Sequence, residues 1–392
     1  MNVSAQTAWN RLKGGVYDKW RQYWIQKHPT QIGERSWKAI FENRGKEIRP
    51  NLCCEIYTIL QSPSALQTLG PESVAELAFA IECIHIASLI LDDTPFMDNS
   101  DMRRNKPAIH RQFSIMQSLV FSYEIFEMIQ QIWVQNRPEH ISTEDWWGFL
   151  KTKLIQLAIG QIHDLQSTGD IYTLAVMKTG TLFEFASELP AYILGGPVEY
   201  WRTWGRIVGI LFQWADDWED REDDRIHSTR NAFNEGQSIV ASAYAELYKL
   251  VCGDSLVQKN AYIISFLECL NIIAEFGQEQ ISIYSSQQIP ISVYEPNPTR
   301  KYIQMLISEH AYGVQQQQQQ QQQLYHEIYE RLTRHVSVET DVRDTLSFSV
   351  IHRILKKLVL SSNYTIDFDT SILWGCDESL WKNIILQKVL SY

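Results

Sequence analysis

Apolar residues recur at helical spacing along most of the chain, and few segments alternate with the period of two that predicts a strand. The clearest helix is predicted over residues 74–93, where nearly every face is apolar, as in a helix buried inside a bundle. Further helices are predicted over residues 153–165, 182–194 and 204–218, the last of them after a Gly-Gly-Pro break. No Asn-Gly or Asp-Gly dipeptide indicates a tight hairpin. The pattern therefore predicts a mostly α-helical protein.

A proline-rich segment is expected to divide the chain. Residues 289–300 contain three prolines and have the composition of a linker or loop. We expect a catalytic helical bundle over residues 1–300 and a helical extension over residues 301–392. The extension holds nine consecutive glutamines at 315–323, which indicate a solvated helix or a connector and no catalytic role. Helix-like spacing around this run covers residues 302–310, 324–334 and 346–360.

The composition limits the classes of function. The chain has 392 residues, of which 45% are hydrophobic, which is enough for a sizeable core. Its net charge of −11 argues against a general nucleic-acid or anionic-membrane surface, because either would need a basic face that neutralises phosphate. Any phosphate must therefore be bound locally, by a small group of cations.

Cysteine usage and hydropathy predict a cellular compartment. The six cysteines contain no CxxC pair and no spacing with histidine that indicates zinc, so we expect reduced, buried thiols. The most apolar stretch, residues 74–91, is interrupted by Glu76, Glu82 and His85 and is shorter than the roughly 20 residues of a membrane span. No segment has the basic start and unbroken apolar core of a secretory signal. We expect a cytoplasmic protein without a transmembrane segment.

Two acidic clusters about 120 residues apart carry the candidate chemistry. The acids are Asp92, Asp93 and Asp98 in the first cluster and Asp216, Asp217 and Asp220 in the second. We expect the chain to turn after Asp93 so that Asp98 lies beside Asp92. In the second cluster the acids and Gln213 recur at i, i+3, i+4 and i+7 and share one helical face. Mg²⁺ prefers oxygen ligands and joins one or two carboxylates to substrate phosphates, so two opposed acidic faces predict a Mg²⁺ site for a polyphosphate.

Each cluster also has a purely structural interpretation. The second cluster, taken alone, has the composition of a solvated acidic surface. The first cluster could form an ion-pair network with Arg103 and Arg104. Further cations that suit phosphate oxygens are Lys46, Arg49 and Lys178, although each alone is compatible with an ordinary surface residue. His85 lies two helical turns before Asp92, where either a buried neutral histidine or a phosphate donor fits.

In this order the motifs resemble those of the trans-isoprenyl diphosphate synthases. The matching segments are DDTPFMD at 92–98 with Arg103-Arg104, FQWADDWED at 212–220, GKEIRP at 45–50, KTG at 178–180 and GQIHDL at 160–165. The resemblance covers roughly residues 45–236, about half of the chain. It implies an all-α isoprenoid-synthase bundle of antiparallel helices around a deep central cavity, and a homodimer.

The resemblance also implies an activity and a role for each site residue. The activity is Mg²⁺-dependent elongation of dimethylallyl, geranyl or farnesyl diphosphate with isopentenyl diphosphate. Asp92, Asp98 and Asp216 would ligate three Mg²⁺ ions, with Asp93, Asp217 and Asp220 in support. Arg103 and Lys178 would bind the allylic diphosphate, and Lys46, Arg49, His85 and Arg104 the diphosphate of isopentenyl diphosphate. Thr179 and Gln213 would lie beside the developing allylic cation.

Product length is predicted from two small residues. Ser88 and Ala87 lie four and five residues before Asp92, one helical turn deeper along the cavity wall. Short-chain members of the family have a bulky aromatic residue there as a floor. The small side chains leave room, which favours geranylgeranyl diphosphate, although Phe121 from a neighbouring helix could still close the cavity.

Departures from the family pattern leave two alternatives open. Arg44 and Glu47 replace a glycine and a basic residue of the N-terminal signature, Asn105 replaces a glycine, and Gln237 stands where the family has lysine. The last replacement supports a non-catalytic, regulatory subunit of a heteromeric prenyltransferase, although such subunits typically lose the acids of one motif. A class I terpene cyclase would need Glu where Ser242 stands and has no use for a second diphosphate site.

Overall fold

The computed structural model describes residues 7–28, 31–61, 69–166, 171–227, 231–253 and 257–271, together with 305–306, 308–310, 312–313 and 316. The helical elements are α1 (Ala8–Lys27), α2 (Gln31–Phe41), α3 (Ile48–Leu60), α4 (Pro71–Asp92), α5 (Ile109–Gln112), α6 (Ile115–Gln135), α7 (Thr143–Leu165), α8 (Ile171–Leu174), the π-helix η1 (Ala175–Gly180), α9 (Thr181–Leu194), α10 (Val198–His227), α11 (Ala232–Cys252), the 3₁₀ helix η2 (Val257–Lys259) and α12 (Ala261–Cys269). A hairpin of β1 (Met102–Arg103) and β2 (Lys106–Pro107) is the only sheet among the described residues. The predicted all-α fold is confirmed.

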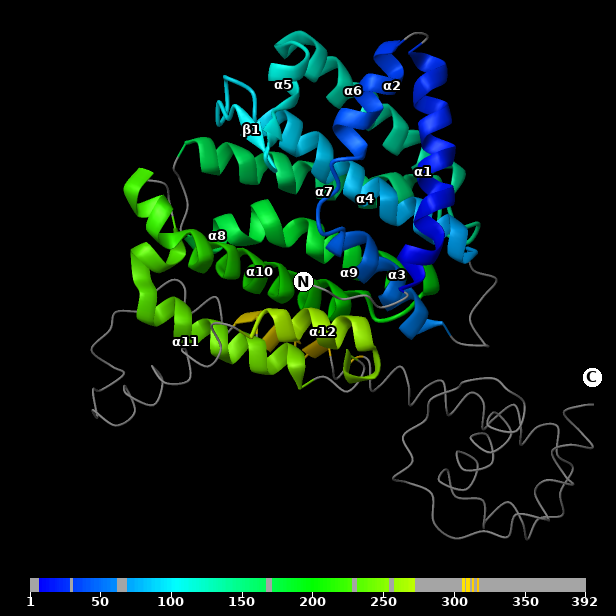
Figure 1. Ribbon diagram of the computed structural model, residues 1–392. Helices are drawn as coiled ribbons and strands as arrows, with labels where there is room; N and C mark the ends of the chain where they lie inside the picture. The colour runs from blue at the N-terminus through cyan, green and yellow to red at the C-terminus, as the bar shows by residue number, and fades with distance from the viewer. Residues whose placement is uncertain are drawn as a thin grey trace, which may run out of the picture. The chain divides into compact units, whose positions relative to one another are not determined.

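Helix α9 lies at the centre of the bundle and contacts α3, α4, α7, α10 and η1. Helix α10 packs against α9, η1 and α11, while α4 packs against α3 and α6 (Figure 1). Almost every residue of α9 is buried, which explains why its sequence is apolar on all sides. Helices α4 and α10, which lead to and carry the two acidic clusters, therefore both pack on this central helix.

The helix ends follow local sequence signals. Pro71 occupies the first turn of α4, where its missing amide hydrogen costs nothing. Ser142 caps α7 by accepting a hydrogen bond from the amide of Asp145 at 3.0 Å. Helix α9 ends at Gly195, whose φ of 64° gives the left-handed conformation that glycine adopts freely. Helix α10 begins six residues earlier than predicted, directly after the Gly-Gly-Pro break.

Sequence reasoning missed the hairpin. Its turn consists of Arg104 and Asn105, with φ of 50° and 60°, and two consecutive left-handed residues form the turn whose twist suits a two-residue hairpin. Asparagine tolerates this conformation better than most residues, so Asn105 replaces glycine at no great cost. Arg104 is held there by its side chain, which donates a hydrogen bond to the carbonyl of Asn43 at 2.9 Å.

Helix α4 has the length and composition of a membrane-spanning helix, and it is the one such helix in the described part of the chain. Of its most apolar window, 67% is buried inside the protein, as in a core helix. The predicted segments at 289–300, 324–334 and 346–360 and the glutamine run, except Gln316, lie outside the described residues.

Candidate active site

The first acidic cluster lies where α4 ends. Asp92 is the last residue of the helix, and the chain turns so that the amide of Asp98 donates a hydrogen bond to the carbonyl of Asp92 at 2.8 Å. The predicted return of Asp98 to Asp92 is therefore confirmed. Burial raises the pKa of Asp92 to about 6; Asp98 adds to the rise, whereas Lys178 opposes it. The two carboxylates are close enough for the charge of Asp98 to act on Asp92, so a cation between them would be favourable.

The carboxylate of Asp93 is engaged by Arg103. Asp93 is buried, and its Oδ1 accepts hydrogen bonds from Nη2 of Arg103 at 2.5 Å and from Nε at 3.0 Å. A charge-assisted contact through two nitrogens fixes the guanidinium plane beside the end of α4. The structure thus brings Arg103 to the acidic cluster, as predicted for a ligand of the allylic diphosphate. Its contact with Asp93 leaves the metal role of that acid a prediction.

The cations predicted for the second diphosphate gather around His85. Burial lowers the pKa of His85 well below its usual value, and Arg49, Arg104 and Arg103 lower it further. His85 is therefore neutral. The guanidinium groups of Arg49, Arg103 and Arg104 lie near it and form a cation cluster. The buried Nε of Arg49 has no hydrogen-bond partner among the described residues. An excess of positive charge with an unused donor suits a polyanion.

Gly45 makes room for one of these cations. A side-chain carbon at residue 45 would lie 2.5 Å from Nη2 of Arg104, closer than real contacts allow. The glycine of the GKEIRP segment thus lets the guanidinium of Arg104 lie against the backbone before α3. Lys46, next in the chain, is exposed, and its charge lowers the pKa of Asp216 on α10. Lys46 therefore lies between the cation cluster and the second acidic cluster.

The second acidic cluster occupies one face of α10, as predicted from its spacing. Gln213 donates a hydrogen bond from Nε2 to Oδ1 of Asp217 at 2.8 Å, and the amide of Ala232 donates to Oδ2 at 3.0 Å. Asp217 thus ties α10 to the start of α11. Burial raises the pKa of Asp216 to about 6, against the effect of Lys46, and Asp220 raises it further. Asp216 is partly buried, whereas Asp220 is exposed.

The KTG segment forms the end of η1 and lies between two glycines. A side-chain carbon at Gly160 of α7 would lie 2.8 Å from the backbone of Met177, and one at Gly209 of α10 would lie 2.6 Å from the Cα of Gly180. Both helices therefore approach η1 backbone to backbone. Within η1, Thr179 donates a hydrogen bond from Oγ1 to Oε1 of Gln213 at 2.5 Å.

The close approach of α7 gives Lys178 an acidic partner. Its Nζ lies 2.5 Å from Oδ2 of Asp164, which was noted in the sequence only as part of the GQIHDL segment. Burial lowers the pKa of Lys178, but the net shift is upward because Asp164, followed by Asp92 and Asp98, stabilises the charged form. Lys178 thus faces the first acidic cluster from η1, where the predicted allylic diphosphate would lie. The signal for Asp164 was its place in that segment, one turn after Gly160.

The acids suit Mg²⁺ that is shared with a diphosphate. Among the described residues, no three His, Cys, Asp or Glu side chains converge as a ready metal site. Mg²⁺ usually takes only one or two carboxylates and completes its shell with water and substrate phosphate oxygens, so such a cage is not needed. The pKa values of Asp92 and Asp216 are raised mainly by burial, and the opposing effects of Lys178 and Lys46 do not cancel the rise. The donor set of hard oxygens therefore fits the ion.

Of the two residues predicted to set product length, only Ala87 lies in the core. Ala87 is fully buried, and Ser88 donates a hydrogen bond from Oγ to the carbonyl of His85 at 2.9 Å. A cavity of about 50 Å³ beside α4 is lined by Asp93, Arg103 and Arg104 but not by Ala87. The deep central cavity stays a prediction.

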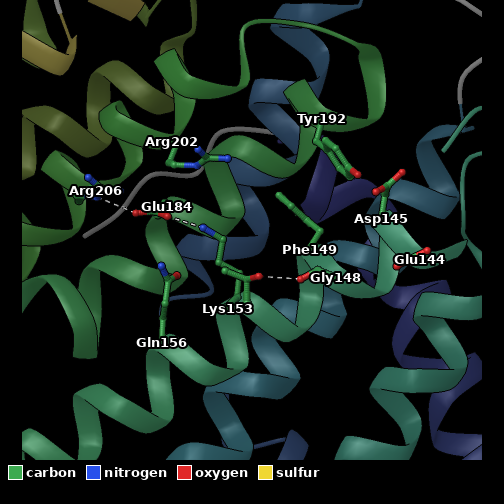
Figure 2. A pocket seen from close by; sticks show the side chains of 11 residues that line it. Glu144, Asp145, Gly148, Phe149, Lys153, Gln156, Glu184, Tyr192, Arg202 and Arg206 are labelled. Carbon is green, nitrogen blue, oxygen red and sulfur yellow. Dashed lines mark hydrogen bonds and ion pairs between the residues drawn. The ribbon is translucent and has the colours of Figure 1, made fainter. Parts of the chain in front are cut away.

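A larger cavity of about 580 Å³ lies among α7, α9 and α10 and contains none of the predicted site residues. Figure 2 shows Lys153, Glu184 and Arg206 together on one side of it and the ring of Tyr192 on the other. Lys153 is buried and pairs with Glu184 and Glu188, while Arg206 pairs with Glu184 at 2.8 Å. The pKa of Glu184 is lowered by Lys153 and Arg206 although burial opposes the shift. Since these charges compensate one another, the cluster serves to join three helices.

Comparison with known proteins places the chain among prenyl synthases. It is 33% identical over 191 residues to geranylgeranyl pyrophosphate synthase 4 of Arabidopsis thaliana. This match covers 44% of this chain and 48% of the relative. It is 28% identical over 232 residues to the small subunit of a heterodimeric geranylgeranyl pyrophosphate synthase of the same plant, covering 55% and 68%. The chain spans about half the length of the first curated relatives that it matches.

Solved structures show the same fold. A geranyltranstransferase from Thermotoga maritima superimposes with a TM-score of 0.54 at 22% identity, over 70% of this chain and 99% of that one. The model for the family described as polyprenyl synthetase matches residues 30–234, which is more than half of the chain and includes both acidic clusters and the cations between them. With its two aspartate-rich helices packed around α9, the chain belongs to the polyprenyl synthetase family.

Proposed function

We propose that the protein elongates an allylic diphosphate with isopentenyl diphosphate and releases a short-chain prenyl diphosphate, geranylgeranyl diphosphate above all. The observation that carries the proposal is that cations lie at two places. Lys178 and Arg103 lie beside Asp92 and Asp98, whereas Arg49 and Arg104 lie near the neutral His85, and Arg103 acts on both places. One diphosphate site would suffice for an enzyme that acts on a single diphosphate, so two sites favour a condensation of two such substrates.

The acids and cations divide the work of the proposed reaction. Asp92, Asp98 and Asp216 would hold Mg²⁺, which would supply positive charge to the departing pyrophosphate group. Arg103, oriented by Asp93, and Lys178, oriented by Asp164, donate hydrogen bonds where that negative charge develops. The allylic carbon then forms its new bond to the double bond of isopentenyl diphosphate, and a proton leaves to the pyrophosphate.

Thr179 and Gln213 are positioned for the electron-poor carbon. The hydroxyl of Thr179 donates a hydrogen bond to Gln213. The lone pairs of the hydroxyl oxygen therefore remain available to an adjacent positive charge. Gln213 is in turn oriented by its hydrogen bond to Asp217. The surrounding apolar side chains exclude water, which would otherwise capture the cation.

We infer a homodimer in the cytoplasm that uses three Mg²⁺ ions. Supporting the assembly, Met116, Val120 and Tyr123 form an exposed row on α6, and Ile155, Ile159 and Ile162 form another on α7. Both rows have helical spacing, and apolar patches of this kind favour burial against a second chain. Cys53, Cys54 and Cys83 are buried free thiols, which suits a reducing compartment.

The proposal is tested by incubating the 392-residue protein with Mg²⁺, labelled isopentenyl diphosphate and dimethylallyl, geranyl or farnesyl diphosphate. We expect elongated products that contain 20 carbons, no product without Mg²⁺, and loss of turnover in Asp92→Asn and Asp216→Asn. Asp101→Asn is the matched control, because the side chain of Asp101 is exposed and pairs with Arg111. Absence of any elongated product would reject the synthase, and a hydrocarbon product would indicate a cyclase.

A non-catalytic subunit of a heteromeric prenyltransferase is the second candidate. It is favoured by the match to 68% of the heterodimeric small subunit of Arabidopsis thaliana and by Gln237 in place of the family lysine. Retention of both acidic clusters argues against it. An inactive chain that changes the product length of an added catalytic homologue would support this candidate over the synthase.

A further inference from the structure

Glu47 has an unusual backbone conformation at the edge of the cation cluster. It lies directly after Lys46 and two residues before Arg49, and its φ of 47° is left-handed. Few non-glycine residues adopt this conformation, and glutamate lacks the short polar side chain that helps asparagine to do so. Such residues concentrate at functional sites, where surrounding contacts hold them in place. Arg104, with φ of 50°, is a second example in the same cluster.

The side chain of Glu47 is held by α1. Glu47 is buried, its Oε2 lies 2.7 Å from Nζ of Lys13, and its Oε1 accepts a hydrogen bond from the hydroxyl of Tyr17 at 3.0 Å. Its carbonyl accepts hydrogen bonds from the backbone amide of Asn51 at 3.3 Å and from the side-chain amide of the same residue at 2.7 Å. Contacts on both sides of the residue therefore fix its backbone.

Tyr17 joins this arrangement to the core and to a second departure from the family pattern. Its ring lies 4.9 Å from that of Phe79 on α4, and the guanidinium of Arg44 lies 3.8 Å from its centroid. Arg44 and Glu47 thus contact the same side chain of α1. The acidic residue at position 47 gains two donors from this helix, which explains how it replaces a basic residue of the signature.

We propose that Glu47 is a positioning residue that, together with Lys13 and Tyr17, aims Lys46 and Arg49 at the diphosphate of isopentenyl diphosphate. The inference rests on the proposed function. Lys46 extends toward α10, with its Nζ 5.8 Å from the ring centroid of Phe212, whereas Arg49 lies over the ring of Phe183 on α9 at 4.9 Å. The left-handed conformation of Glu47 lets the side chains of Lys46 and Arg49 reach α10 and α9, respectively. Helix α1 thereby sets the affinity of this subsite without touching the substrate.

Lys13→Met is the first test, because Lys13 is partly exposed and its loss leaves the core intact. We expect KM for isopentenyl diphosphate to rise on the order of tenfold, while KM for the allylic diphosphate and kcat stay within about twofold. Tyr17→Phe should act in the same direction. Lys19→Met is the matched control, because Lys19 of α1 pairs with Glu76 of α4 at 2.5 Å and does not contact residues 43–49. An unchanged KM in Lys13→Met, or an equal change in Lys19→Met, would overturn the inference.

A double-mutant cycle separates positioning from general destabilisation. In Glu47→Gln, the further change Lys13→Met should alter KM by less than about twofold, because its partner charge is already absent. Additive effects would contradict a shared role. Calorimetry with inorganic pyrophosphate gives a readout that does not require turnover, and Lys13→Met should bind it more weakly than Lys19→Met does. If the wild type elongates no substrate, the proposed function fails while this binding comparison still decides the inference.

Discussion

In the proposed reaction, the side chain at position 87 of α4 would limit product length. Ala87 is fully buried five residues before Asp92, so an added ring there would reduce the space in the predicted central cavity. We predict that Ala87→Phe shortens the product by at least one five-carbon unit, measured by chromatography of the dephosphorylated products. Insertion of a ring into a packed core also costs about 1–3 kcal/mol of unfolding free energy.

Ala75→Phe provides the control for this cost. Ala75 is equally buried on the same helix, three turns earlier and away from the acids. It should lower the melting temperature to a similar extent while the product keeps its length. Equal shortening in both variants, or an unchanged product in Ala87→Phe, would contradict the role of Ala87.

At the scale of single residues, the sequence predicts contacts between residues that are close in the chain but not contacts between distant segments. The order and spacing of the acids predicted that Asp98 turns back to Asp92 and that Gln213 and Asp217 share a face, because both relations are local. The contact between Arg103 and Asp93 depends on a hairpin for which no dipeptide signal exists. Lys13 and Glu47 meet across 34 residues of chain, and no local pattern predicts such a pair.

Helices α7, α9 and α10 depend on the buried charges between them. Lys153 contacts Glu184 and Glu188 in the core, so Lys153→Met leaves two buried carboxylates with one cation fewer. Removal of one partner from a buried ion pair costs about 3–5 kcal/mol, so we predict that loss of unfolding free energy in urea denaturation. Turnover measured well below the new melting temperature should be retained, because the cluster lies away from the proposed site.

Arg225→Met is the matched comparison on the surface of α10. Arg225 pairs with Glu222 at 2.7 Å, and both side chains are largely exposed. Exposed pairs contribute about 0–1 kcal/mol, so this variant should denature close to the wild type. A similar loss of unfolding free energy in the two variants would contradict a larger contribution from the buried cluster.

The apolar pattern predicted helices α4, α7, α9 and α10, but it did not predict the π-helix η1. All four helices predicted before α11 are present, and α10 extends beyond the predicted residues at both ends because its charged second half has no apolar stripe to follow. The π-helix η1 depends on close packing by Gly160 and Gly209 from helices on either side. Such a contact arises only when α7 and α10 are in place.

Residues beyond the predicted domain boundary at 300 pack on α10. Leu306 and His310 are buried, the ring of His310 lies 5.3 Å from that of Tyr200, and Glu309 pairs with Arg206 at 3.2 Å. The described residues up to Gly313 belong to the same compact unit as the helical bundle. The division at residue 300 stays a prediction, since a proline-rich segment indicates a break in regular structure but not which side the following helix joins.

His310 makes the stability of the whole chain depend on pH. Burial lowers its pKa from 6.5 to about 4, so the unfolded chain binds a proton in this range that the folded chain does not. This contribution to stability is complete above pH 6.5 and is lost as the pH falls toward 4. We predict that the difference in unfolding free energy between wild type and His310→Phe narrows or reverses over this window, as measured by denaturation at several pH values. A difference that is constant between pH 7 and 4.5 would contradict a buried neutral histidine.

The glycine contacts on either side of η1 have a consequence for protein engineering. Gly160 and Gly209 fix the separation of α7 and α10 by backbone contact, so the distance across the KTG segment cannot be tuned by exchanging side chains. If the proposed reaction takes place, a library that seeks new product lengths should therefore vary α4 around Ala87 and keep both glycines constant. Substitutions on α4 would change the volume available to the product, while Gly160 and Gly209 would keep the separation of α7 and α10 unchanged.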